Sequence, residues 1–192
     1  MTGTAGPRYA LFPTALGPCG IAWRDGRVIG TRLPDADPAL TGRGLARRHG
    51  AVPGEPPAAV AAAIAAIAAL LEGGRTDLAA IDCDLDEADP FAVRVYAAAR
   101  AIPAGETRTY GAVAEALGDG ALARRVGRAL SRNPLPIVVP CHRVIGADGR
   151  LVGFSAPGGV GTKLRMLAIE GVRIGGAPGL FDDLPLATRP SR

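Results

Sequence analysis

Apolar and polar positions alternate in the first part of the chain, a pattern typical of short strands with one buried face. The segments 9–12, 20–24 and 27–33 follow it, and Asp25-Gly26 between the last two is a hairpin-turn signal. The apolar spacing over 78–85 indicates one more strand. These segments predict a small sheet of three or four strands.

Two segments between these strands have the composition of helices. Residues 58–71 are mostly alanine with interspersed valine, isoleucine and leucine, and the pair Gly73-Gly74 follows, as is common after a helix C-terminus. A shorter helix is expected near 39–48. The acidic, proline-containing stretch 82–90 then interrupts the pattern. We therefore predict an α/β scaffold domain over 1–86.

The rest of the chain is predicted to be mostly helical. An amphipathic segment over 91–101 opens it, and two helices at 110–117 and 121–132 follow, joined by a turn with two glycines. Helix, short glycine turn and helix is the sequence shape of a helix-turn-helix. We predict an α/β (α+β) protein with a winged-helix-like second domain over 87–175 and a Gly/Pro-rich tail over 176–192.

Bulk composition restricts the class of protein. A hydrophobic content of 48% suits a soluble globular chain, and the longest apolar run, 56–71, is too short and too rich in alanine to span a bilayer. The N-terminus lacks a basic region followed by an apolar core, so no secretory signal is recognised. The three cysteines form an odd and sparse set, which favours a reducing compartment. We expect a cytoplasmic protein without a membrane partner.

Charge is distributed unevenly along the chain. Residues 1–87 carry a net charge of −2, whereas residues 88–175 carry +6. Lys163 is the only lysine, so arginine is the usual cation of this chain, but this does not explain the asymmetry. A basic half beside a slightly acidic half indicates a polyanion that meets one domain only.

The second helix of the predicted helix-turn-helix is strongly basic. Arg124, Arg128 and Arg132 lie on one stripe at about 100° per residue, with Arg125 beside it, and no acid occurs among residues 121–132. A solvated basic face is the alternative interpretation. The apolar residues of the helix lie on its opposite side and are expected to face the core: Leu122, Val126 and Leu130.

The run 137–145 contains the candidate reactive group. Its apolar start predicts a buried strand, and Cys141 then stands directly before His142 and Arg143. A thiol is a strong nucleophile only as the thiolate, and a neighbouring histidine or arginine favours that form. A buried structural cysteine is the alternative. We expect Arg143 to be an internal salt-bridge partner rather than a phosphate contact.

Several short motifs follow one another in a fixed order over about 85 residues. The motifs are Asp89-Pro90-Phe91, Pro103 to Gly111, Ala123 to Leu130, Asn133-Pro134, Pro140 to Val144, Gly153 to Gly159 and Lys163 to Gly171. In this order they resemble the O6-alkylguanine-DNA alkyltransferases, the methylated-DNA–protein-cysteine methyltransferases, and a family match of this kind is a hypothesis about function.

The resemblance implies DNA repair by direct reversal. The base is flipped out of the duplex, and its alkyl group is transferred irreversibly and stoichiometrically to Cys141. By position, His142 takes the thiol proton through a water, Glu170 orients His142, and Tyr110 donates toward the guanine. Asn133 braces the turn between the recognition helix and the active-site strand. O6-alkylguanine in double-stranded DNA is the implied substrate, and activity on O4-alkylthymine is left open.

The resemblance also implies a DNA-binding set and a base pocket. The recognition helix enters the minor groove, where Arg124 takes the space of the extruded base and small residues permit close approach. The DNA-binding set is Tyr110, Ala121, Ala123, Arg124, Arg125, Gly127, Arg128 and Arg132. The pocket set is Pro140, Val144, Gly153, Phe154, Ser155, Gly158 and Gly159. The loop departs from the family by an apparent two-residue insertion and by phenylalanine in place of tyrosine, so the range of alkyl groups is left open.

No cofactor is implied, and the expected state is a monomer. Some relatives hold zinc in the first domain, but the spacing of Cys19, His49 and Cys83 is unlike a compact zinc motif. We weigh three other functions. An alkyltransferase-like lesion-binding protein lacks the acceptor cysteine, and a helix-turn-helix regulator would carry a further DNA-binding domain. A cysteine hydrolase would need an oxyanion hole.

Overall fold

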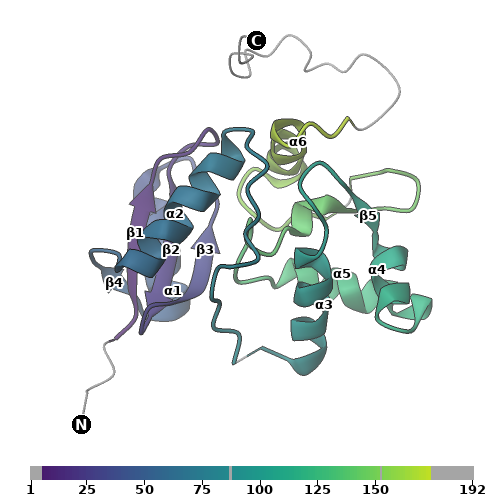
Figure 1. The fold of residues 1–192 in the computed structure, drawn as a ribbon, viewed down its shortest axis with the longest axis horizontal. Helices are drawn as coiled ribbons and strands as arrows, with labels where there is room; N and C mark the ends of the chain where they lie inside the picture. The colour runs from purple at the N-terminus through teal and green to yellow at the C-terminus, as the bar shows by residue number, and fades with distance from the viewer. Residues whose placement is uncertain (1–5, 87, 152, 174–192) are drawn as a thin grey trace.

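A computed structural model describes residues 6–86, 88–151 and 153–173. The predicted tail over 176–192 lies outside the described residues. A sheet with two helices forms one half of the molecule, and a group of helices forms the other (Figure 1). The mixed α/β class predicted from the pattern is confirmed.

The first half is built on a four-stranded sheet with strand order β3-β2-β1-β4. Strands β1, β2 and β3 are antiparallel neighbours, and β4 pairs in parallel with β1. The three longer strands and both helices occur where the sequence predicts them, while β4 was not predicted. The elements are β1 (Arg8–Phe12), β2 (Cys19–Arg24), β3 (Arg27–Arg32), α1 (Pro38–His49), β4 (Val52–Pro53) and α2 (Ala58–Leu71).

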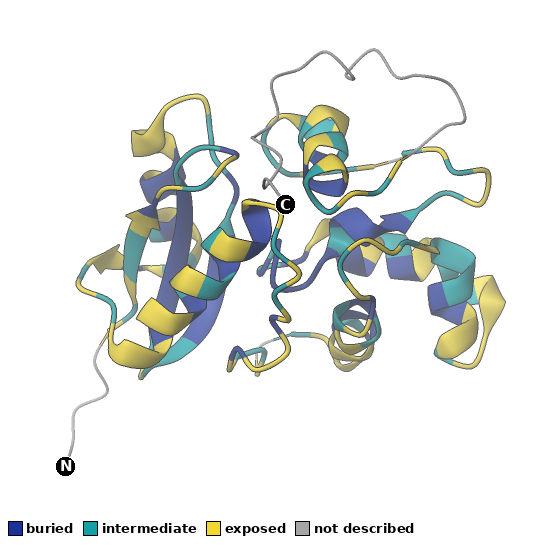
Figure 2. Ribbon diagram, turned by 45° about the horizontal axis from the view of Figure 1, so that its top comes forward, coloured by how far each residue is buried: buried dark blue, intermediate teal, exposed yellow. Residues whose placement is uncertain are grey.

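Alternation along the strands sends side chains to two different faces of this sheet. Ala22 and Ile29 pack with Leu45 of α1, whereas Ile21 and Trp23 join the larger core that includes α2. The sheet therefore lies between α1 and α2, and its strands β2 and β3 are mostly buried (Figures 1 and 2). The larger core continues into the second half, so one apolar cluster connects the two halves.

The second half consists of short elements around the continuation of that core. The predicted second helix begins two residues later than expected, at Ala123, because residues 120–122 form a 3-10 turn whose N-terminus Asp119 caps. The elements are α3 (Pro90–Arg100), β5 (Arg108–Thr109), α4 (Tyr110–Ala116), η1 (Gly120–Leu122), α5 (Ala123–Ser131), η2 (Cys141–Arg143), β6 (Val144–Ile145) and α6 (Gly159–Ile169).

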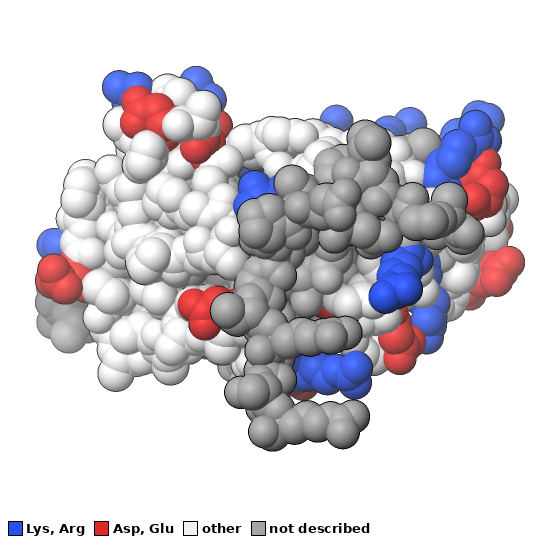
Figure 3. Space-filling view, turned by 90° about the horizontal axis from the view of Figure 1, so that it is seen from above, with Lys and Arg blue, Asp and Glu red and all other residues white. Residues whose placement is uncertain are grey.

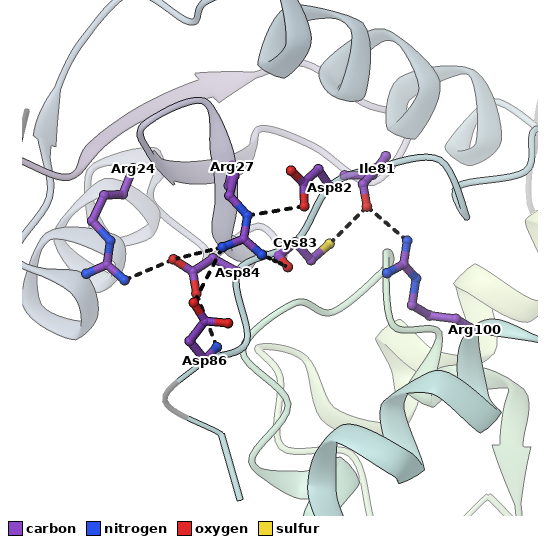
Figure 4. A network of polar contacts seen from close by, with 8 residues as sticks. All are labelled: Arg24, Arg27, Ile81, Asp82, Cys83, Asp84, Asp86 and Arg100. Carbon is purple, nitrogen blue, oxygen red and sulfur yellow. Dashed lines mark hydrogen bonds and ion pairs between the residues drawn. The ribbon is translucent and has the colours of Figure 1, made fainter. Parts of the chain in front are cut away.

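The strand predicted over 78–85 is wrong. Only an isolated bridge between Val28 and Cys83 forms there. Arg100 of α3 instead binds three carbonyls of this segment through Nη2, those of Leu78, Ala79 and Ile81. Arg24 and Arg27 hold its acidic end through ion pairs with Asp82, Asp84 and Asp86 (Figure 4). Because its polar groups bind arginines from both halves, the segment is an anchored connection without a strand ladder.

Candidate active site

Cys141 lies where η2 begins, beside a cavity of about 330 Å³. The residues before it do not form the predicted strand. Ile137 has a positive φ of 81°, and the only pairing in this segment is a bridge between Pro136 and Val139. The chain thus turns sharply before the cysteine, which places Cys141 at the cavity wall.

Asn133 determines this turn. Its side chain is buried, with Nδ2 donating to the Val139 carbonyl at 2.9 Å and Oδ1 accepting from the Leu135 amide at 2.9 Å. A backbone hydrogen bond from the Val139 amide to the Leu135 carbonyl closes the turn at 2.8 Å. A buried amide that satisfies backbone groups in this way rigidifies the segment. Asn133 therefore links the end of α5 to the start of η2.

His142, Arg143 and Glu170 form a buried charged cluster behind Cys141. His142 Nε2 lies 2.9 Å from Glu170 Oε1. Arg143 donates two hydrogen bonds to the same carboxylate, from Nε to Oε2 at 2.9 Å and from Nη2 to Oε1 at 2.8 Å. Its Nη1 donates to the Ile102 carbonyl at 2.6 Å. The salt bridge expected of Arg143 is present, and its partner is the acid expected to orient His142.

The protonation states in this cluster follow from burial and pairing. Burial alone would raise the pKa of Glu170, but the hydrogen bonds from His142 and Arg143 lower it to about 2. Burial lowers the pKa of His142, and Glu170 only partly opposes this. His142 is therefore neutral at neutral pH and donates through Nε2 to the ionised Glu170. Nδ1 of His142 is buried without a hydrogen-bond partner among the described residues, so its lone pair is the one that can take a proton.

The thiol of Cys141 needs such a base. Burial raises its pKa, while the Asn133 side chain and the Lys163 charge act in the opposite direction. Lys163 is fully buried, and its Nζ donates to the Val144 carbonyl at 2.6 Å and lies 5.9 Å from the centre of the Tyr110 ring. Burial also raises the pKa of Tyr110, with the neighbouring Cys141 acting in the same direction. The resting thiol and phenol are thus both protonated.

Only part of the predicted pocket set lines the cavity beside Cys141. Gly153, Phe154 and Ser155 line it, together with Tyr110 and Asn133. The other predicted members are not among its lining residues. Pro140 borders a different cavity, Val144 is fully buried, and Gly158 and Gly159 form the start of α6.

Gly158 has a structural reason to be glycine. It is the N-cap residue of α6 with a positive φ of 78°, and a Cβ there would lie 2.2 Å from Thr162 Oγ1. That hydroxyl already donates to the Pro157 carbonyl at 2.8 Å, so it is held in place. Ala156 and Pro157, which precede this glycine in the loop, also line the cavity.

The predicted DNA-binding residues of α5 are divided between two sides of the helix. Gly127 lies against the Tyr110 ring and lines the Cys141 cavity. Arg125, Arg128 and Arg132 line a larger cleft toward α3 and the first half. Arg124 is exposed and lines neither space, and Ala121 and Ala123 are exposed and partly exposed at the start of the helix. Val126 and Leu130 are buried and Leu122 packs against the core, as the pattern predicts.

Comparisons with known proteins identify the family. The model of the 6-O-methylguanine DNA methyltransferase DNA-binding domain matches residues 90–172. A methylated-DNA–protein-cysteine methyltransferase of Mycolicibacterium paratuberculosis is 38% identical over 84% of this chain and 91% of its own. One of Mycobacterium leprae is 45% identical over 65% of this chain and 73% of its own. The chain belongs to this family.

Solved structures extend the likeness to the whole fold of this methyltransferase. The crystal structure of the Mycobacterium tuberculosis O6-methylguanine methyltransferase has a TM-score of 0.71 at 33% identity, over 92% of this chain and 99% of that one. The M. tuberculosis OGT in complex with DNA has a TM-score of 0.70 at 33% identity, over 85% of this chain and 92% of that one. The first half, which the family model does not match, is thus part of the shared fold.

That first half also contributes to the methyltransferase site. Thr31, Arg32, Leu33 and Arg48 line the Cys141 cavity. Thr31 donates its amide to the Pro134 carbonyl at 3.0 Å and its Oγ1 to the Pro136 carbonyl at 2.5 Å.

Sequence reasoning did not find these residues, because no local pattern connects segments about a hundred residues apart. It also gave Lys163 no role, although being the only lysine was a usable signal.

Among the described residues, no group of three or more His, Cys, Asp or Glu side chains lies together in a way that could hold a metal ion. No described helix has the length and apolar character needed to cross a membrane.

Proposed function

We propose that this methyltransferase repairs O6-alkylguanine in double-stranded DNA by taking the alkyl group onto Cys141 once, without regeneration. The observation that carries the proposal is the position of Cys141 at a cavity of about 330 Å³, directly before a buried histidine paired with a carboxylate. Family membership indicates the class of reaction. The positions and hydrogen bonds of the residues around Cys141 support the individual roles proposed below.

The reaction is a displacement at the alkyl carbon. His142 Nδ1 accepts the thiol proton, and Glu170 stabilises the resulting imidazolium through Nε2. The thiolate attacks the alkyl carbon, the new S–C bond forms, and the O6–C bond breaks with its electron pair remaining on guanine. Tyr110 stabilises the charge on the leaving base by donating a hydrogen bond. The product thioether is stable, so each chain reacts once.

Arg143 and Arg124 have different roles in the proposal. Arg143 is bound to Glu170 and keeps that carboxylate ionised, so that His142 remains the base. Arg124, exposed at the start of α5, occupies the space of the flipped nucleotide in the duplex. Small residues at Ala123 and Gly127 let α5 lie close to the minor groove. We further propose that the protein acts as a monomer.

Intact-protein mass spectrometry tests the proposal. One equivalent of O6-methylguanine duplex is expected to add about 14 Da, the mass of one methylene group, at Cys141 only. A second equivalent is expected to stay unrepaired. Cys141→Ser should bind the duplex without a mass change, and Cys83→Ser, which alters the other partly exposed cysteine, should react normally. Turnover, or modification at Cys19 or Cys83, would contradict the proposal.

A further inference from the structure

A cleft of about 770 Å³ lies between the two halves of the molecule. α5 and α3 border it on one side, and α1 and the sheet border it on the other. Five arginines line it: Arg24, Arg48, Arg125, Arg128 and Arg132. The reaction proposed above does not use this space. On the face seen in Figure 3, by contrast, much of the sheet half is uncharged.

The acids in the cleft are already engaged. Asp84 pairs with Arg24 at 3.0 Å, and Asp89 caps α3 by accepting from the Phe91 amide at 2.9 Å and the Ala92 amide at 3.1 Å. Among the described residues, no carboxylate lies within 4.0 Å of the other four arginines. Among the described residues that line the cleft there are five arginines and two carboxylates, so these side chains carry a net charge of +3.

Two of these arginines are held in place by neighbours. The Arg125 guanidinium lies 3.9 Å from the centre of the Phe91 ring, a cation–π contact that fixes it at the edge of the cleft. Arg48 of α1 donates from Nη2 to the Arg132 carbonyl at 2.9 Å and thereby connects the first half to the end of α5. Both guanidinium groups remain exposed and keep further donors for an anion.

The cleft lies on the opposite flank of α5 from the reacting thiol. Gly127 and Ser131 face the Cys141 cavity, whereas Arg125, Arg128 and Arg132 face the cleft. A helix in the minor groove has one phosphate backbone on each side, because the groove is only about 6 Å wide. If the strand with the flipped base lies on the Cys141 side, the other strand passes along the cleft.

We propose that this cleft binds the phosphate backbone of the undamaged DNA strand, and that Arg48 extends the DNA-binding surface onto the first half of the chain. The proposal rests on the proposed function, because it takes the flipped base to enter the Cys141 cavity. It replaces the expectation that the polyanion meets the second domain only. The net charge of −2 over residues 1–87 concealed this, because it averages the acidic segments of the first half with α1, which carries three arginines and no acid.

Adjacent arginines of α1 provide a matched pair for the test. Arg47 and Arg48 are both exposed and carry the same charge, but only Arg48 lines the cleft. In a Cys141→Ser background, which does not consume the substrate, duplex affinity is measured by fluorescence anisotropy across a salt series. Arg48→Ala should make the slope of log Kobs against log salt shallower by about 0.9, one phosphate contact. Arg47→Ala should leave the slope unchanged.

Two further variants separate phosphate binding from support of α5. Arg48→Lys keeps the charge, so it should restore the slope even though the guanidinium contact with Arg132 is altered. Arg48→Ala combined with Arg128→Ala should reduce the slope by about two contacts. Equal slopes for Arg48→Ala and Arg47→Ala, or no rescue by lysine, would overturn the proposal.

Measurements of alkyl transfer distinguish a failure of the cleft proposal from a failure of the proposed repair function. With Cys141 intact, Arg128→Ala, whose side chain lines the cleft but not the Cys141 cavity, should take the alkyl group from free O6-benzylguanine within about two-fold of the parent rate, because that base needs no duplex contact. A parent protein that takes no methyl group from duplex DNA would contradict the proposed function. If the parent protein does react with duplex DNA but Arg48→Ala has the same salt slope as the parent, the cleft proposal alone is overturned.

Discussion

Replacing Glu170 by glutamine tests the buried cluster behind Cys141. Glutamine has nearly the same shape but no charge, so Arg143 would lose its counter-ion. The Arg143 and Glu170 side chains are 7% and 1% exposed, so water cannot replace the lost partner. His142 would also lose the carboxylate that stabilises its protonated form. We expect both stability and transfer rate to fall.

The magnitude follows from the burial of the pair. Removing one member of a buried ion pair costs about 3–5 kcal/mol, because the remaining charge is desolvated and uncompensated. For a chain of this length, each kcal/mol lowers Tm by roughly 2–4 °C, which gives a decrease of about 6–20 °C. The loss of general-base assistance is expected to slow alkyl transfer by about 100-fold or more.

Urea unfolding and single-turnover transfer from O6-benzylguanine, both at a temperature where each variant is folded, measure the two effects separately. The control is Glu170→Gln combined with Arg143→Met, which removes the uncompensated charge. It should regain part of the stability but none of the rate. The reasoning is refuted if Glu170→Gln unfolds within about 1 kcal/mol of the parent and reacts within about three-fold of its rate.

Two other predictions concern stability. Thr31→Val removes the hydroxyl that binds the Pro136 carbonyl and should lower the unfolding free energy by roughly 1–3 kcal/mol in a urea titration, while Thr31→Ser should not; equal losses would argue against this hydrogen bond. Acid should destabilise the protein as pH falls through about 4.5 toward 2, since the folded pKa of Glu170 is about 2. Neutral, buried His142 should add a loss below about pH 6.5, because the unfolded chain binds that proton first; a Tm that rises on acidification would contradict both.

Local pattern was sufficient for the elements whose cause is local. Alternation predicted the three long strands, and helical spacing predicted which face of α5 is buried at Val126 and Leu130. The motif order led to the family and to Cys141, His142 and Glu170 as a set. These features depend on residues within a few positions of one another, or on a recognisable order of motifs, and both are present in the sequence.

Tertiary structure decided what depends on distant partners. The apolar segment before Cys141 is a turn because Asn133 satisfies its backbone, and the apolar segment 78–85 is not a strand because arginines bind its polar groups. The hydrogen bond from Thr31 to the Pro136 carbonyl joins residues 105 positions apart, and the one from Arg48 to the Arg132 carbonyl joins residues 84 positions apart. Hydrophobic periodicity records only which side of an element is buried. Which polar groups meet across the core depends on how the two halves pack, and that is determined only when the chain folds.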